Sequence, residues 1–227
     1  MKVGILLSGC GVYDGSEIQE TISAMIALEE LNIQYVGISV NKNQHHVINH
    51  LDGSEMNETR NMMIESARII RGNVVDIKTI TPSDIDGLVI PGGFGNAKNL
   101  STWAFNGADG EILPEVKLLL INLVNIGKPI AALCVSPILI SLAFKDSTIS
   151  PTLTLGSTKD KSPYDIQSFH LGIEKNGSHS IEKGINELSI DESNRIICAP
   201  CYMQDASLLD IRNNAKMAIE KLAEFID

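Results

Sequence analysis

The sequence predicts an α/β fold, a three-layer sandwich in which helices cover both faces of a mostly parallel sheet. Short segments that are apolar throughout alternate with segments whose apolar residues recur at helical spacing. A strand inside a parallel sheet is covered on both faces, so it is apolar at every position rather than at every second one. Alternation of such strands with helices is typical of α/β domains.

The predicted elements follow in order along the chain. Strands are expected at the apolar runs, which are residues 2–8, 33–40, 74–77, 87–91, 129–133, 152–156 and 195–200. Helices are expected where the spacing is helical, at residues 16–31, 54–72, 115–126, over about ten residues after 133, and at 206–225. Gly72 is a natural cap for the end of the second helix. The pair Asn176-Gly177 predicts a hairpin turn.

Length and composition exclude several classes of protein. The 227 residues suffice for a single domain spanning 1–227. A net charge of −10 argues against nucleic acid and anionic membranes as partners, and no run of 18 apolar residues is present. The apolar start breaks at Ser8-Gly9, too early for a signal peptide, so we expect four free cysteines in a reducing compartment. These features predict a soluble cytoplasmic protein.

Cys134 lies in the segment "ALCVS" (132–136), between a predicted strand and a predicted helix. Small residues two before and two after it suit the tight turn of a nucleophile elbow, and Pro137 suits the first turn of a helix. A sulfur at a helix N-terminus lies near unpaired N–H groups, which favour the thiolate. The alternative is a cysteine of the core, because free cysteine is among the most buried residue types.

A glycine-rich loop, "VIPGGFGNAKNL" (89–100), follows another predicted strand. In parallel α/β folds, sites gather outside the carboxyl ends of the strands, so this loop is expected near Cys134. Gly92 and Gly93 allow the backbone to approach a ligand and present N–H groups, as an oxyanion hole requires. A plain turn explains the glycines equally well.

The loop after the first strand places Glu17 near the start of a helix, in "GCGVYDGSEIQE" (9–20). One interpretation is a capping box, with Asp14 as N-cap and Glu17 as the third helical residue. The other is a carboxyl group that burial keeps protonated and that hydrogen-bonds a thiolate. The spacing leaves both interpretations open.

Cysteine and histidine pairs elsewhere could also carry chemistry. Cys198 and Cys201 form a C-x-x-C at the end of a predicted strand, where packing or a redox role, with Cys201 as a resolving thiol for Cys134, are the alternatives. No second pair completes a zinc site. His46 and His50 are four residues apart, but no carboxylate completes a ligand set, so we expect surface or packing roles and no metal.

Five segments together resemble one protein family over nearly the whole chain. The resemblance is to the ElbB type, proteins that enhance lycopene biosynthesis and have an amidotransferase-like domain. This type lies within the PfpI-like superfamily, which is related to class I glutamine amidotransferases. The segments are "LSGCGVYDGSEIQE", "VINHLDGSEMNETRNMMIESARIIRGN", "VIPGGFGNAKNLS", "GKPIAALCVSP" and "DESNRIICAPCYM".

The resemblance implies a flavodoxin-like fold with Cys134 on the elbow and Glu17 beside the sulfur. It implies that the backbone N–H groups of Gly93 and Val135 form an oxyanion hole. The superfamily includes cofactor-independent glyoxalases, so we expect glyoxal-type dicarbonyls to become hydroxy acids through a hemithioacetal on Cys134. No cofactor is expected. We further expect a homodimer, with a small carbonyl compound as its substrate and a link to isoprenoid biosynthesis.

Departures from the superfamily pattern keep two other functions open. No histidine follows the elbow, and neither His170 nor His179 belongs to a His-x-Glu pair. The alternatives are a non-catalytic redox-sensing or regulatory protein of isoprenoid metabolism and an amidase or glutaminase-like hydrolase. Gly92 and Tyr202 are expected to contact the substrate, and Asn99 either contacts it or caps a turn.

Overall fold

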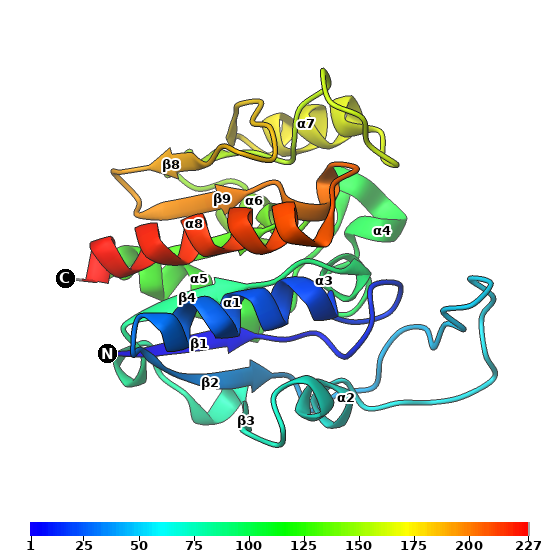
Figure 1. The fold of residues 1–227 in the computed structure, drawn as a ribbon. Coiled ribbons are helices and arrows are strands. Elements are labelled where there is room, and N and C mark those ends of the chain that lie inside the picture. Colours follow the sequence, from blue (N-terminus) through cyan, green and yellow to red (C-terminus); the bar gives the residue numbers. More distant parts are fainter. Residues whose placement is uncertain (227) are drawn as a thin grey trace.

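The computed structural model describes residues 1–226, and seven of its strands form a central sheet (Figure 1). Their order across the sheet is β3-β2-β1-β4-β5-β9-β8. Neighbouring strands are parallel except for β8 and β9, which are antiparallel. This sheet confirms the predicted α/β fold. The strands are β1 (Lys2–Leu6), β2 (Gln34–Ser39), β3 (Val74–Asp76), β4 (Gly87–Ile90), β5 (Ile130–Leu133), β8 (Ser189–Asp191) and β9 (Ile196–Ala199).

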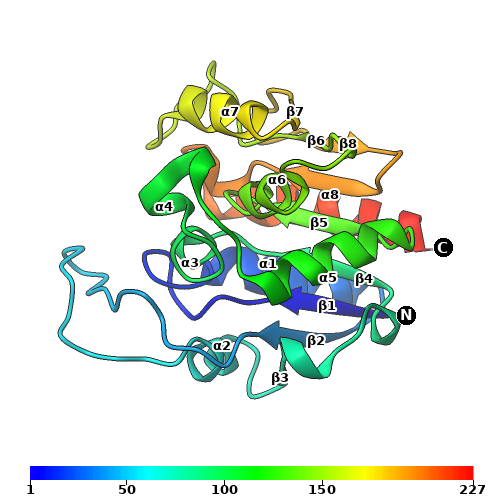
Figure 2. The same cartoon turned by 180° about the vertical axis from the view of Figure 1, so that it is seen from behind.

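Helices cover both faces of the sheet, as the buried strands require. On one face, α1 (Ile18–Glu30) packs against α8 (Leu208–Ile226), and α2 (Met62–Ile69) lies beside β2 and β3 (Figure 1). On the other face, α5 (Pro114–Asn125) packs against α6 (Pro137–Phe144) (Figure 2). Every residue of α6 is buried. The strands and helices share one apolar core, built mainly from Ile, Leu, Val and Ala.

Shorter elements complete the described chain. The strands β6 and β7 form a separate parallel pair that adjoins the β8–β9 end of the sheet. These elements are α3 (Phe94–Lys98), α4 (Trp103–Asn106), α7 (Ile166–Lys175), β6 (Thr152–Leu153), β7 (His179–Ser180) and the 3-10 turns η1 (Ile77–Thr79), η2 (Pro82–Asp84), η3 (Gly107–Asp109) and η4 (Cys201–Met203).

Two sequence-based expectations about local structure are wrong. The helix expected over 54–72 begins only at Met62, because the Asn61 side chain accepts the N–H of Ile64 and caps it there. The hairpin expected at Asn176-Gly177 is instead the end of α7, where Gly177 has φ +86°. A glycine with positive φ just after a helix is a common helix terminator, and it has the same sequence signature as a tight turn.

The loops after β1, β4, β5 and β9 meet at the carboxyl edge of the sheet. Each contributes to one pocket, through Val12, Gly93, Cys134 and Tyr202 respectively. These strands are parallel neighbours, so their carboxyl ends necessarily lie on the same side. Within residues 1–226, no helix is long and apolar enough to cross a membrane.

Candidate active site

Cys134 occupies a sharp turn between β5 and α6. Its φ is +57°, a left-handed conformation that side-chain-bearing residues rarely adopt and that marks functional turns. The Cys134 N–H donates to the Ala199 oxygen at 2.8 Å, and Ser136 Oγ donates to the Ile90 oxygen at 2.8 Å, so both neighbouring strands hold the turn. Cys134 is 5% exposed and lines a pocket, which gives it both the burial of a core residue and the position of an elbow.

Glu20 is the carboxyl group beside the sulfur. Its Oε2 and the Cys134 sulfur meet at Gly92, where an added Cβ would lie 2.6 Å from the oxygen and 2.8 Å from the sulfur. Its two oxygens also accept backbone N–H groups, from Gly92 at 2.8 Å and from Tyr202 at 3.2 Å. Burial and then the Glu17 carboxylate raise the pKa of Glu20 to about 8. Burial and then Glu20 raise the pKa of the Cys134 thiol well above its ordinary value. The two groups therefore form a buried acid–base pair.

The expectation that Glu17 lies beside the sulfur is corrected by this arrangement. Glu17 is the N-cap of α1, and its carboxylate accepts the Glu20 N–H at 2.6 Å. The capping box with Asp14 as N-cap is also wrong, because the Asp14 carboxylate accepts the Ile48 N–H at 2.7 Å instead. Glu20 lies three residues later, within the first turn of α1, and is fully buried, whereas Glu17 is 8% exposed.

A sequence signal for Glu20 exists in the helical phase of α1. Glu20 is on the same buried stripe as Ala24, Ala27 and Leu28, at the spacing i, i+4, i+7 and i+8 that faces a core. A glutamate on a core-facing stripe is almost never buried without a partner. The phase of the helix, rather than its capping motif, therefore identifies the functional carboxyl group.

The glycine loop packs directly against this pair. A Cβ added to Gly92 would lie 2.5 Å from Cys134 Cβ and 2.6 Å from Glu20 Oε2, so only glycine fits. The Gly92 N–H donates to Glu20, so Gly92 holds the carboxyl group in place, and its contact with substrate stays a prediction. Within residues 1–226, the N–H groups of Gly93 and Val135 donate to no protein oxygen. The Val135 N–H hydrogen-bonds the Cys134 sulfur, which opposes the rise of its pKa.

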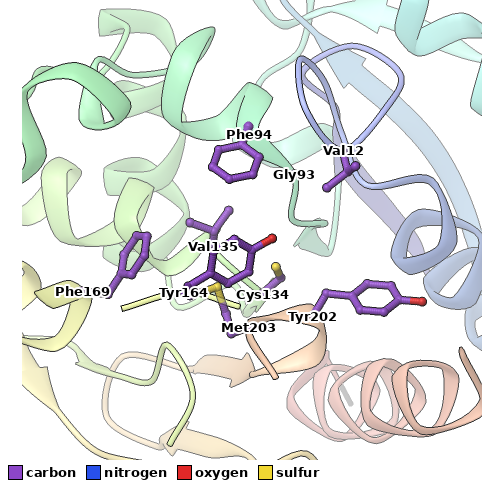
Figure 3. A pocket seen from close by; sticks show the side chains of 9 residues that line it. All are labelled: Val12, Gly93, Phe94, Cys134, Val135, Tyr164, Phe169, Tyr202 and Met203. Carbon is purple, nitrogen blue, oxygen red and sulfur yellow. The ribbon is translucent and has the colours of Figure 1, made fainter. Parts of the chain in front are cut away.

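The pocket above Cys134 is small and apolar, with a volume of about 330 Å³ including its open mouth (Figure 3). No histidine lines it in the described part of the chain. Tyr164 and Met203 were not anticipated as lining residues; burial raises the pKa of Tyr164 to about 12, so its hydroxyl stays protonated. Tyr202 lines the pocket, and its contact with substrate stays a prediction. The full lining is Val12, Gly93, Phe94, Cys134, Val135, Tyr164, Phe169, Tyr202 and Met203.

Asn99 lies outside this pocket and is structural. Its side-chain amide donates to the oxygens of Ser8 at 2.8 Å and Asp14 at 2.7 Å, and its oxygen accepts the His45 N–H at 2.8 Å. It is 6% exposed, and it ties together the loops after β1 and β4. Its contact with substrate stays a prediction.

The C-x-x-C cysteines are both buried. Cys198 lies within β9, and burial raises its pKa to about 12. Cys201 follows the strand, and its thiol faces the backbone N–H of Cys134. The pairing of Leu133 with Ala199 places the two chain segments side by side. All four cysteines are free thiols.

The histidine pair of the sequence does not form a site. Residues 41–61 are not helical, so His46 and His50 do not share a helix face. Nε2 of His50 accepts the Tyr13 N–H at 3.2 Å, and its Nδ1 lies 3.0 Å from the Ile48 oxygen. Within residues 1–226, no cluster of three His, Cys, Asp or Glu side chains has the arrangement of a metal site.

Comparison with known proteins identifies relatives of this chain. No family model matches the chain. The "ES1 protein homolog, mitochondrial" of Rattus norvegicus is 32% identical, covering 98% of this chain and 83% of that protein. The human "Glutamine amidotransferase-like class 1 domain-containing protein 3, mitochondrial" is also 32% identical, over 98% of this chain and 82% of that protein. Both relatives are named mitochondrial, which contradicts the cytoplasmic location expected above. The expectation was wrong because charge and composition report on solubility and not on the compartment.

Solved structures of related proteins have the same fold. An isoprenoid biosynthesis protein with an amidotransferase-like domain, from Ehrlichia chaffeensis, has a TM-score of 0.89 and 32% identity, with 100% of both chains covered. DJ-1 of Schizosaccharomyces pombe has a TM-score of 0.59 and 16% identity, over 99% of this chain and 90% of that one, which supports the flavodoxin-like fold. The chain therefore belongs to the family of ES1 proteins and isoprenoid biosynthesis proteins with an amidotransferase-like domain, as the five segments predicted.

Proposed function

We propose that this protein is a cofactor-independent, glyoxalase-like enzyme that converts small dicarbonyls to hydroxy acids. The observation that carries the proposal is the fully buried Glu20 carboxyl group beside the Cys134 sulfur, which lines an apolar pocket. A nucleophile with a carboxyl group in direct contact has the pairing that nucleophilic catalysis requires. The N–H groups of Gly93 and Val135, which donate to no protein oxygen in residues 1–226, supply the donors for a developing oxyanion; the Val135 N–H moves from the sulfur to that oxygen.

The first step forms a hemithioacetal. The Glu20 carboxylate accepts the thiol proton as the Cys134 sulfur attacks one aldehyde carbon of glyoxal. The carbonyl electron pair moves onto its oxygen, which the N–H groups of Gly93 and Val135 stabilise. This oxygen then takes the proton from Glu20, which becomes a carboxylate again.

The second step moves a hydrogen between the two carbons. Glu20 removes the C–H proton of the hemithioacetal carbon, giving an enediolate, and returns it to the neighbouring carbon, while the hydroxyl proton passes from the oxygen of the first carbon to that of the second. The product is a thioester of glycolate on Cys134. Water hydrolyses it, releasing glycolate and the free thiol, so the net reaction adds one water to glyoxal. Because the pKa of Glu20 is about 8, activity should rise with pH up to about that value.

Two variants test the assignment. Cys134→Ser should abolish glyoxal consumption, and Glu20→Gln should lower kcat by about 10²–10⁴, the usual contribution of a positioned acid or base. Glyoxal loss and glycolate appearance are measured together. Glu174→Gln, on the exposed surface of α7, is the matched control and should keep full activity. If Cys134→Ser consumes glyoxal as fast as wild type, the cysteine has no part in the mechanism.

A redox role is the second candidate, and Cys201 favours it. Hydrogen peroxide would oxidise the Cys134 sulfur to a sulfenic acid with release of water. The neighbouring Cys201 thiol would then displace a second water and close a disulfide. Mass spectrometry after mild peroxide treatment should detect a peptide pair joined through residues 134 and 201. Oxidation of Cys134 to sulfinic acid without this pair would argue against Cys201 as the resolving thiol.

The amidase alternative lacks structural support. A glutaminase of this superfamily carries a histidine beside its cysteine, and the pocket has none in the described part of the chain. We propose that the protein is associated with isoprenoid biosynthesis, as the name of the Ehrlichia relative suggests. Ammonia release from glutamine by the purified protein would instead support the amidase.

A further inference from the structure

A wider groove continues outward from the Cys134 pocket. Its volume is about 1470 Å³ including its open mouth, and it shares Phe94, Val135, Tyr164 and Phe169 with the inner pocket. The groove is therefore the approach to the sulfur, and it has room for a substrate larger than glyoxal. Its walls are apolar or aromatic with one charged exception, Lys98.

Lys98 has no counter-ion in the groove. Within residues 1–226, no carboxylate oxygen lies within 4.0 Å of its ammonium group. The ammonium donates one hydrogen bond, to the Tyr13 oxygen at 3.0 Å, and lies 5.6 Å from the centre of the Phe94 ring. Two of its three N–H groups remain available. A half-buried cation among apolar walls gains most from an anionic ligand, because water solvates it incompletely.

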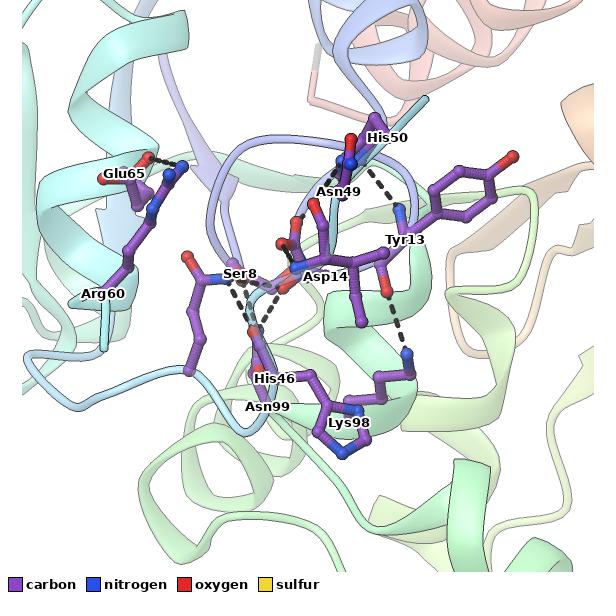
Figure 4. A network of polar contacts seen from close by, with 12 residues as sticks. Ser8, Tyr13, Asp14, His46, Asn49, His50, Arg60, Glu65, Lys98 and Asn99 are labelled. Carbon is purple, nitrogen blue, oxygen red and sulfur yellow. Dashed lines mark hydrogen bonds and ion pairs between the residues drawn. The ribbon is translucent and has the colours of Figure 1, made fainter. Parts of the chain in front are cut away.

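The position of Lys98 is held by its surroundings (Figure 4). The Tyr13 backbone that accepts the Lys98 hydrogen bond is itself tied to His50 through its N–H, at 3.2 Å. Asn99, the next residue in the chain, is anchored by three hydrogen bonds to the loops. Phe94 and Lys98 are the first and last residues of α3, so they share one helix face about 6 Å apart along the axis.

We propose that Lys98 binds an anionic group of the substrate, and this inference rests on the proposed function of Cys134. The substrate is then a carbonyl compound with a carboxylate or a phosphate ester, separated from the reacting carbonyl by a short apolar spacer. The carbonyl reaches Cys134, the spacer lies along Phe94, and the anion pairs with Lys98. A single ammonium is a point charge without the fork geometry of arginine, so it accepts either anion.

Three matched substrates test the charge preference. They are phenylglyoxal, 4-carboxyphenylglyoxal and 4-phosphonooxyphenylglyoxal, which differ only in the group that reaches the groove. We expect kcat/KM for at least one charged substrate to exceed that for phenylglyoxal about tenfold, the effect of one partly desolvated ion pair. The larger of the two ratios identifies the preferred anion. The preference should fall with added NaCl, since salt screens the pair.

Variants assign the preference to Lys98. Lys98→Met should reduce the charged-to-neutral ratio to about one, whereas Lys98→Arg should keep most of it. The matched control is Lys2→Met, which removes the same charge from an exposed lysine at the start of β1 and should leave the ratio unchanged. Equal loss of kcat/KM for all three substrates in Lys98→Met would overturn the proposal, because Lys98 would then only hold the Tyr13 loop.

Binding separates this inference from the proposed reaction. By titration calorimetry, benzoate or phenyl phosphate should bind wild type about tenfold more tightly than Lys98→Met. Equal binding to both proteins overturns the role of Lys98 even if glyoxal is turned over. Weaker binding to the variant, in a protein that consumes no dicarbonyl, overturns the glyoxalase reaction and keeps the anion site.

Discussion

Replacing Glu20 with glutamine should make the folded protein lose less stability than wild type as pH rises, while it removes activity. Glu20 is fully buried, and its pKa is about 8 in the fold against 4.5 for a free side chain. The folded state therefore keeps a proton on Glu20 over a pH range in which the unfolded chain releases it. Above that range, folding must bury a carboxylate, which is unfavourable.

The sign follows from proton linkage. Between about pH 4.5 and 8 the native state binds more protons than the unfolded state, so the free energy of unfolding falls as pH rises. The stabilising contribution of the protonated group is fully present below pH 4.5 and is lost through pH 8. The gap of about 3.5 pH units corresponds to at most about 5 kcal/mol, at 1.36 kcal/mol per unit. Glu20→Gln carries no charge and escapes this loss.

Thermal or urea unfolding at pH 5 and pH 8.5 measures the effect. The variant should gain on wild type as pH rises, by up to about 10–20 °C in Tm at the higher pH. Glu174→Gln, exposed on α7, should follow wild type at both values. A difference between Glu20→Gln and wild type that is the same at both pH values would refute a buried, protonated Glu20.

Three further perturbations follow from the same contacts. Glu17→Gln removes the charge that helps to raise the pKa of Glu20, so the rise of glyoxal kcat/KM with pH should move to lower pH; an unmoved profile contradicts the coupling. Gly92→Ala places a Cβ 2.8 Å from the Cys134 sulfur and should abolish turnover while circular dichroism stays native; full activity would show that the loop yields easily. Asn99→Ala leaves three backbone partners unpaired, two of them buried, and should lower the free energy of unfolding by about 3 kcal/mol, measured in urea. A loss below about 1 kcal/mol contradicts its tying role.

The fold was largely predictable because its signals are local. Apolar runs with no polar alternation mark strands such as β4 and β5, where all four residues are buried. The errors arose where two structures share one signal. Asn176-Gly177 fits a hairpin turn as well as a helix end, and the polar residues before Met62 have helical spacing without a helix. The homodimer expected from the family stays a prediction.

The candidate site was only partly predictable. The elbow at Cys134 is a local feature, since small neighbours and a proline at the start of a helix are written in consecutive residues. Choosing between Glu17 and Glu20 needs the rotation of α1 against the sheet, which the capping motif does not report. The Lys98 groove is lined by residues that lie far apart in the chain, such as Ile48, Lys98 and Tyr164, so no local pattern predicts it.

By itself, the sequence determined the alternation of strands and helices, the turn that holds Cys134 and the family. Only the tertiary structure decided which carboxyl group reaches the sulfur and which N–H groups near it donate to no protein oxygen. The physical reason is how far apart in the chain the interacting residues lie. Strand, helix and turn depend on neighbours in the chain, whereas the contact of Cys134 with Glu20 and Gly92 depends on the order of β1, β4 and β5 in the sheet and on the packing of α1 against it.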